Sequence, residues 1–268
     1  MSADQSPSLP TPPTRWQRPS ALTWLALVLL LAFVLQGLNN AELSLARLVR
    51  GFFRLGNFLA QAFPPTIERL PNLVAATVET FQMALIGTLF GALLSLPLAV
   101  LAARTVSPHP LLHLATRSLI GFMRAVPDLI WGLIFIVAVG LGPAAGILAI
   151  MIDTISFCGR FYAERIEELD SGPLDALRAT GATYLAVLVN GVAPAALPSF
   201  VATTLFSLEG SVRSAVVLGL VGAGGIGIEL ATAMQLLRYE EAATIIIIIF
   251  VVVIGVERLS STIRRRVL

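Results

Sequence analysis

Residues 81–103 read FQMALIGTLFGALLSLPLAVLAA, a run without a single charged side chain. A helix needs about 20 mostly apolar residues to cross a bilayer, so this run is long enough. Ala21–Leu38 is also free of charge, and Ala242–Val256 packs isoleucines and valines together. Only 13% of the 268 residues are charged, against roughly 25% in a soluble domain, and the mean hydropathy is +0.86. These features predict an integral membrane protein.

The apolar runs predict an all-α, polytopic fold with about six transmembrane helices. The predicted spans cover residues 21–38, 79–103, 119–140, 143–159, 195–218 and 242–257. Four regions follow from them. They are a disordered cytoplasmic tail (1–20), a first span with an external connection (21–78), a transmembrane core (79–258) and a basic cytoplasmic tail (259–268).

The arginines orient these spans. With the N-terminus inside, eleven arginines fall on the cytoplasmic side and five outside, as the positive-inside rule favours. The cytoplasmic set is Arg15, Arg18, Arg104, Arg117, Arg160, Arg165, Arg178, Arg258 and Arg264–Arg266. We therefore expect both termini in the cytoplasm, with residues 39–78 and 228–241 outside.

The N-terminal part leaves two questions open. The run 21–38 is longer than a signal-peptide core and is followed by further spans, so we interpret it as a retained anchor. Cleavage near Asn40–Ala46 is the alternative. Apolar residues recur at helical spacing over 45–59, which predicts an amphipathic helix. It either lies in the membrane interface or packs across the other spans.

Several kinds of chemistry are excluded by the residues present. All 18 basic residues are arginine, so a Walker-type loop, which needs a lysine at the phosphates, is absent. Cys158 is the only cysteine and cannot form an internal disulfide. His109 and His113 are spaced to share a helix face, but no third metal ligand lies near them in sequence. We expect no metal and no cofactor.

Residues 222–227 read GAGGIG and match the dinucleotide-binding pattern G-x-G-x-x-G. That pattern needs a preceding strand within a βαβ unit. Here its flanks are predicted membrane spans, so nucleotide binding is not expected. Four glycines instead break a helix and let backbones approach closely. Gly222, Gly224, Gly225 and Gly227 therefore predict a pore-lining or helix-crossing position.

The predicted cytoplasmic loop 160–194 contains two short helices. Ser171 is the expected cap of the first, Asp175 falls in what we take as its first turn, and the helix ends at Gly181. The second covers Tyr184–Val189, before Pro194. This elbow leaves Leu177, Tyr184, Leu185 and Leu188 as an apolar patch. Either another protein covers the patch, or the elbow folds back on its own bundle.

At this loop the chain resembles a known family. Asp175, Ala176, Leu177, Gly181 and Pro194 have the spacing of the E-A-A…G…L-P loop of ABC importer permeases. The similarity covers roughly residues 75–265. It includes an arginine–proline element at Arg124, Pro127 and Asp128, and a region from Glu209 and Arg213 to Gly227 that resembles phosphonate-type permeases. The Gly-rich part is shared with methionine-type permeases. Departures are Asp175, Leu177, Gly191 and Ala193.

The resemblance implies a type I ABC importer permease in a bacterial cytoplasmic (inner) membrane. Two permease subunits, usually identical, form the path through the lipid. Two cytoplasmic ATPase subunits each receive a coupling elbow, and an extracytoplasmic binding protein delivers the solute. The implied solutes are small phosphorus oxyanions such as phosphonate or phosphite, with methionine or phosphate as alternatives. No catalysis and no nucleic-acid partner are implied.

Charged residues within the predicted spans are candidates for the path or its gate, because such residues are costly in lipid. They are Arg124, Asp128, Asp153, Glu209 and Arg213. Arg213 either meets the passing anion or pairs with Glu209 one turn away, and Arg124 has Asp128 at the same spacing. Two other classes of protein fit the sequence less well. An intramembrane enzyme lacks a nucleophile–base constellation, and a secondary transporter would need an internal repeat that we do not find.

Overall fold

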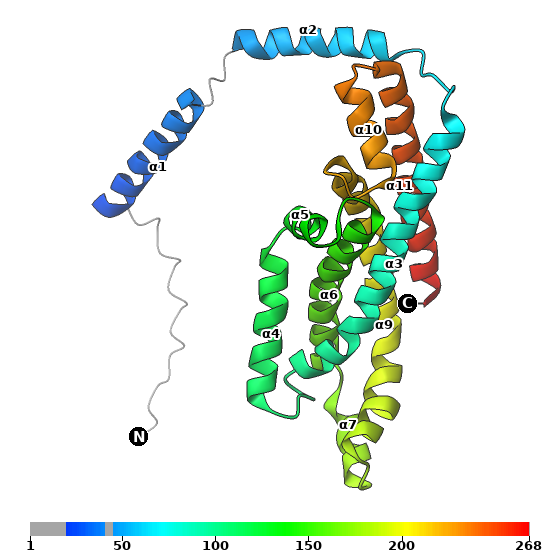
Figure 1. Ribbon diagram of the computed structural model, residues 1–268. Coiled ribbons are helices and arrows are strands. Elements are labelled where there is room, and N and C mark those ends of the chain that lie inside the picture. The colour runs from blue at the N-terminus through cyan, green and yellow to red at the C-terminus, as the bar shows by residue number, and fades with distance from the viewer. Residues whose placement is uncertain (1–19, 41–44, 268) are drawn as a thin grey trace, which may run out of the picture. The chain divides into compact units, whose positions relative to one another are not determined.

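The computed structural model describes residues 20–40 and 45–267 (Figure 1). The predicted tail at 1–20, apart from residue 20, and residues 41–44 of the possible cleavage region Asn40–Ala46 therefore lie outside the described residues. The chain divides into two compact units, Met1–Leu59 and Ala60–Leu268, and each is described by itself.

Helices make up both units. Their bounds are α1 Ala21–Asn40, α2 Leu45–Ala62, α3 Leu70–Ala102, α4 Pro110–Ala125, α5 Asp128–Val139, α6 Pro143–Glu167, α7 Ser171–Ala179, α8 Tyr184–Val187, the π-helix η1 Leu188–Val192, α9 Ala193–Leu220, α10 Gly225–Gln235 and α11 Tyr239–Val267. Five described helices are long and apolar enough to cross a membrane, or six if α4 and α5 together count as one. The all-α prediction is confirmed.

In the first unit, α1 contains the predicted first span and α2 contains the predicted amphipathic helix. α2 places Arg47, Arg50 and Arg54 among apolar residues such as Phe52 and Phe53, whose side chains are exposed. Both helices begin and end within a few residues of the predicted bounds.

The second unit is built around α6, which packs most extensively against α3 (Figure 1). Gly87 and Gly91 of α3 allow the close approach. A Cβ at Gly87 would lie 2.7 Å from Ile150 Cγ2, and one at Gly91 would lie 2.6 Å from Thr154 Cβ. Small residues four apart bring helices together in lipid, where apolar burial gives no driving force. α9 joins this pair through a hydrogen bond of 2.7 Å from Thr88 Oγ1 to Ser211 Oγ.

The predicted span 119–140 is not one helix. It is divided between α4 and α5, which meet at an angle of 89°. Val126 adopts an extended backbone, as expected before proline, and Pro127 lacks the N–H that a continuing helix would need. The indole Nε1 of Trp131 donates across the bend to the carbonyl oxygen of Met123 at 3.2 Å. The proline thus sets a corner inside the bundle.

The predicted external loop 228–241 is also mostly helical. After the glycine turn, α10 begins at Gly225, and α11 already begins at Tyr239. Thr80 Oγ1 accepts a hydrogen bond from Ile226 N at 2.8 Å and so satisfies one free N–H at the start of α10. α11 then continues to Val267, so residues 259–267 are part of a long helix and not a separate tail.

Candidate translocation path and coupling elbow

The two short helices of the elbow are present as α7 and α8, and Gly181 lies between them with φ +79°. This left-handed backbone favours glycine. The cap of α7 is Asp170, whose Oδ1 accepts from Gly172 N at 3.0 Å, so the expectation of Ser171 was wrong by one residue. The second helix continues through η1 into α9, and Pro194 is the second residue of α9.

Asp175 does not lie in the first turn of α7, because that helix begins earlier than predicted. Its carboxylate pairs with Arg178 Nη1 at 2.9 Å, and both side chains are largely exposed. Ala176 beside it is exposed as well. An exposed ion pair of this kind contributes about 0–1 kcal/mol.

One face of the elbow packs against its own bundle. Leu174 is only 6% exposed, and it shares a buried cluster with Tyr162 and Ile166 of α6. Gly191 receives the side chains of α7: a Cβ there would lie 2.7 Å from Leu174 Cδ2 and 3.0 Å from Leu177 Cδ1. The two departures from the family pattern, a larger residue at 177 and a smaller one at 191, therefore compensate in volume.

The other face of the elbow is uncovered. Leu185 is 67% exposed and Val189 is 56% exposed. Tyr184 is half exposed, although its hydroxyl donates to the carbonyl oxygen of Val106 at 2.9 Å. Each of the two expectations for this loop thus describes one face. The elbow folds back on its bundle through Leu174 and Leu177, and it presents apolar side chains on the opposite side.

Glu167, the last residue of α6, links the start of the elbow to neighbouring parts of the chain. Its Oε1 accepts from Arg104 N at 2.7 Å, and its Oε2 pairs with Arg117 Nη2 at 3.1 Å. Arg117 Nε also donates to the carbonyl oxygen of Ala102 at 3.2 Å. These contacts therefore hold the end of α3, the middle of α4 and the end of α6 together next to the elbow.

Glu209 does not pair with Arg213. Its Oε1 lies 2.9 Å from Arg264 Nη2, and the Glu209 side chain is 7% exposed. The physical reason is that Glu209 is buried where α9 packs against α11, whereas Arg213 lies on an exposed part of α9. Across the described ranges, the Arg213 guanidinium has neither a hydrogen bond nor an ion pair.

The depth of Arg213 follows from its neighbour Ser211, which is bonded to Thr88. Thr88 lies near the middle of α3, a helix of 33 residues. Such a helix is about 50 Å long and exceeds the ~30 Å hydrocarbon core at both ends. Arg213 is therefore close to the middle of the bundle.

Arg124, Asp128 and Asp153 lie near one another around the α4–α5 corner. Asp153 is within electrostatic range of both Asp128 and Arg124. The Arg124–Asp128 pair suggested by their spacing does not form, because the helix breaks between them. Asp128 Oδ1 instead accepts from Leu129 N at 2.8 Å, and the Arg124 Cζ lies 5.9 Å from the centre of the Phe161 ring.

The glycine motif is a helix crossing. A Cβ at Gly227 would lie 2.2 Å from the carbonyl oxygen of Val216, and one at Gly225 would lie 2.2 Å from Thr80 Oγ1. Gly222 and Gly224 also have positive φ, and a Cβ at Gly224 would lie 2.8 Å from Glu79 Oε1. Of the pore-lining and helix-crossing positions predicted for these glycines, the contacts favour the helix crossing, because the missing Cβ atoms allow α10 to fold back against α9 and α3.

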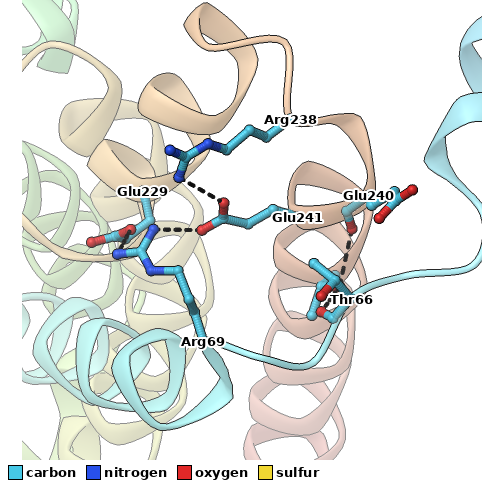
Figure 2. A network of polar contacts seen from close by, with 7 residues as sticks. Thr66, Arg69, Glu229, Arg238, Glu240 and Glu241 are labelled. Atoms are coloured by element: carbon cyan, nitrogen blue, oxygen red, sulfur yellow. Dashed lines mark hydrogen bonds and ion pairs between the residues drawn. The ribbon is translucent and has the colours of Figure 1, made fainter.

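A network at the start of α3 was missed by the sequence reasoning. Figure 2 shows the Arg69 guanidinium between two carboxylates, at 2.5 Å from Glu241 Oε1 and 3.2 Å from Glu229 Oε2. Arg238 approaches the other oxygen of Glu241 at 3.5 Å. The signal was a pair of glutamates at 240–241, which we had assigned to a loop. The network holds α10 and α11 against the beginning of α3.

In the described part of the chain, no three His, Cys, Asp or Glu side chains are placed so that they could hold a metal ion. His109 has a structural role: its Nδ1 accepts from Leu111 N at 3.1 Å and caps α4.

An all-helical membrane bundle with an exposed two-helix elbow is the architecture of the membrane subunit of a transporter. The family described as the binding-protein-dependent transport system inner membrane component matches residues 95–267. The chain belongs to this family. It is an ABC importer permease, as the resemblance implied.

Similar proteins include permeases named for phosphorus oxyanions. The phosphite transport system permease protein PtxC of Stutzerimonas stutzeri is 36% identical over 89% of this chain and 85% of that protein. The phosphate-import permease protein PhnE of Mycolicibacterium smegmatis is 39% identical over 81% of this chain, which corresponds to 41% of that protein. The inward-facing MetNI methionine ABC transporter has a TM-score of 0.67 at 23% identity, over 76% of this chain and 99% of the solved one. That likeness shows the fold.

Proposed function

We propose that this chain forms the membrane path for a small phosphorus oxyanion, such as phosphonate or phosphite, in an ATP-driven importer. The observation that carries the solute class is its similarity, at 35–36% identity over most of both chains, to two phosphite transport permeases. The exposed guanidinium of Arg213 near mid-depth supports it. A planar guanidinium with free donors suits an oxyanion in a water-filled path.

The elbow is the element through which ATP hydrolysis by a separate subunit acts on this chain. Leu185 and Val189 supply an apolar contact surface, and the packing of Leu174 against the bundle makes the elbow move with α6 and α9. Two ATPase subunits, a second permease subunit and an extracytoplasmic binding protein complete the assembly. Asp175, Ala176, Leu177, Gly181 and Pro194 form the coupling segment.

The path residues follow from the same geometry. Arg213 is the candidate for direct contact with the anion, whereas Glu209 is neutralised by Arg264 and acts as a structural pair. Arg124, Asp128 and Asp153 line the corner between α4 and α5, where Pro127 breaks the span. The glycines at 222, 224, 225 and 227 shape the path indirectly, by setting how α10 crosses α9.

The proposed orientation places both termini and the elbow in the cytoplasm, in a bacterial inner membrane. Single cysteines introduced at positions 236 and 170, in a background without Cys158, test it. A membrane-impermeant reagent added from outside should label position 236 and leave position 170 unlabelled. External labelling at 170 would contradict the orientation and the coupling role.

The solute is tested with the assembled complex of permease, ATPase and binding protein in proteoliposomes. Methylphosphonate, phosphite, phosphate and methionine are supplied in turn, and the ATPase rate and uptake are measured. We expect stimulation by phosphonate or phosphite. Stimulation by methionine alone would overturn the solute class while leaving the permease assignment in place.

A further inference from the structure

A pocket of about 170 Å³ lies between the end of α3, the face of α4 and the last turns of α6. Figure 1 shows α4 and α6 side by side, and the two helices are in contact. Arg117, Gly121 and Arg124 of α4 line the pocket together with Arg160 and Glu164 of α6. A water molecule needs only about 10–15 Å³ of such space, so this pocket can hold a small polyatomic group.

The charges around the pocket do not cancel. Three arginines and one glutamate line it, which gives its wall a net charge of +2, or +1 once the Glu167 carboxylate that pairs with Arg117 is counted. Arg160 Nε pairs with Glu164 at 2.8 Å, and Arg117 Nη2 pairs with Glu167, which lies outside the lining, at 3.1 Å. Considering only the residues that the structure describes, Arg124 has no ion pair. Asp153 lies within its electrostatic range.

Hydrogen-bond donors remain available on all three guanidinium groups. A guanidinium has five N–H donors and no acceptor. Arg160 uses Nε for Glu164, and Arg117 uses Nε for the carbonyl oxygen of Ala102 and Nη2 for Glu167. The Nη groups of Arg160, Nη1 of Arg117 and the whole fork of Arg124 have no such bond anywhere in residues 20–40 and 45–267.

We propose that this pocket binds a phosphate-type oxyanion, a tetrahedral group with a charge of −1 to −2. Such a group would accept charge-assisted hydrogen bonds from Arg117, Arg124 and Arg160 and would neutralise the excess charge. A positive-inside bias alone accounts for arginines near this end of the bundle. It does not account for three of them converging on a hollow whose wall contains a glycine.

Two sources can supply this chemistry. Basic pockets between transmembrane helices on the cytoplasmic side bind the head groups of acidic phospholipids. A free phosphate or phosphonate in the cytoplasm carries the same group. The pocket does not include Arg213, the candidate for direct contact with the solute, but it shares Arg124 with the proposed path residues.

The test uses the full-length permease, purified in detergent and freed of native lipid. Inorganic phosphate and a short-chain phosphatidylglycerol are titrated separately, with phosphatidylcholine as the neutral-lipid control, and the dissociation constants are measured. Two variants remove the site in different ways. Arg124→Gln with Arg160→Gln removes two guanidinium groups and their charges, and Gly121→Leu fills the pocket without changing any charge.

Gly121→Leu keeps the test decisive if the arginine variant does not fold. Apart from its chain neighbours and the backbone of its own helix, no described atom lies within 4 Å of a Cβ at Gly121, and leucine favours a helix more than glycine does. Arg258→Gln, on an exposed part of α11 away from the pocket, is the matched control. We expect both pocket variants to bind at least tenfold more weakly, about 1.4 kcal/mol, and the control to bind as the wild type does.

The ligand that saturates identifies the source. Saturation by phosphatidylglycerol and not by phosphate supports a lipid head-group site, and saturation by inorganic phosphate supports a site for the free anion. The proposal is overturned if neither ligand saturates the wild type. It is equally overturned if Gly121→Leu binds as well as the wild type, or if Arg258→Gln loses as much affinity as the pocket variants.

Discussion

Replacing Gly191 by valine should open the elbow, and replacing Leu177 by alanine should partly close it again. A Cβ at position 191 would lie 2.7 Å from Leu174 Cδ2 and 3.0 Å from Leu177 Cδ1. Both are ends of flexible side chains, but Leu174 is almost fully buried and has little room to move. Overpacking of this kind costs about 1–3 kcal/mol.

This overpacking cost should appear as easier local opening of α7. Hydrogen exchange of the amides in residues 171–181 reports the free energy of opening of this segment. A loss of about 1–3 kcal/mol corresponds to exchange about fivefold to 150-fold faster in Gly191→Val. Leu177→Ala alone should accelerate exchange less, because Leu177 is only partly buried. In the double variant the two effects should be less than additive, by about 0.5 kcal/mol or more.

The control is Gly255→Val on α11, where no described atom outside its chain neighbours and its own helix backbone lies within 4 Å of the added Cβ. It should leave exchange in α7 unchanged. If the two elbow substitutions add without coupling, or if Gly255→Val accelerates exchange as much as Gly191→Val, the volume argument is refuted.

Four further outcomes are expected. Gly181→Val should weaken ATPase association or coupling, because position 181 has a φ of +79°. Gly181→Asn should be tolerated better, since asparagine adopts this backbone more readily. Equal uptake by the two variants would exclude a backbone cause. Arg213→Gln should abolish most uptake while the complex assembles normally. In a double-mutant cycle of protein stability, Glu209→Gln should couple with Arg264→Gln. Coupling of Glu209 to Arg213 instead would contradict the observed pair. Gly225→Ala should lower the free energy of unfolding by about 1–3 kcal/mol, because the added Cβ would displace the Thr80 hydroxyl from its buried hydrogen bond. An unchanged melting temperature would argue against that contact.

Local features of the chain were readable from the sequence. The charge-free run at 81–103 predicted a membrane helix because lipid requires a long apolar segment, and α3 contains nearly all of it. Gly181 predicted the joint of the elbow because a single residue type favours the left-handed backbone found there. In both cases the physical cause acts within a few residues of chain, so a one-dimensional pattern carries it.

Features that depend on distant residues were not readable. Glu209 had an arginine four positions away, yet it pairs with Arg264, because the packing of α9 against α11 determines which side of Glu209 is buried. Glu241 was assigned to a loop, yet it is buried between Arg69 and Arg238. Burial makes an unpaired carboxylate costly, so the partner is chosen by whichever guanidinium the tertiary fold brings within reach. Spacing along the chain predicts only the neighbours that a single helix supplies.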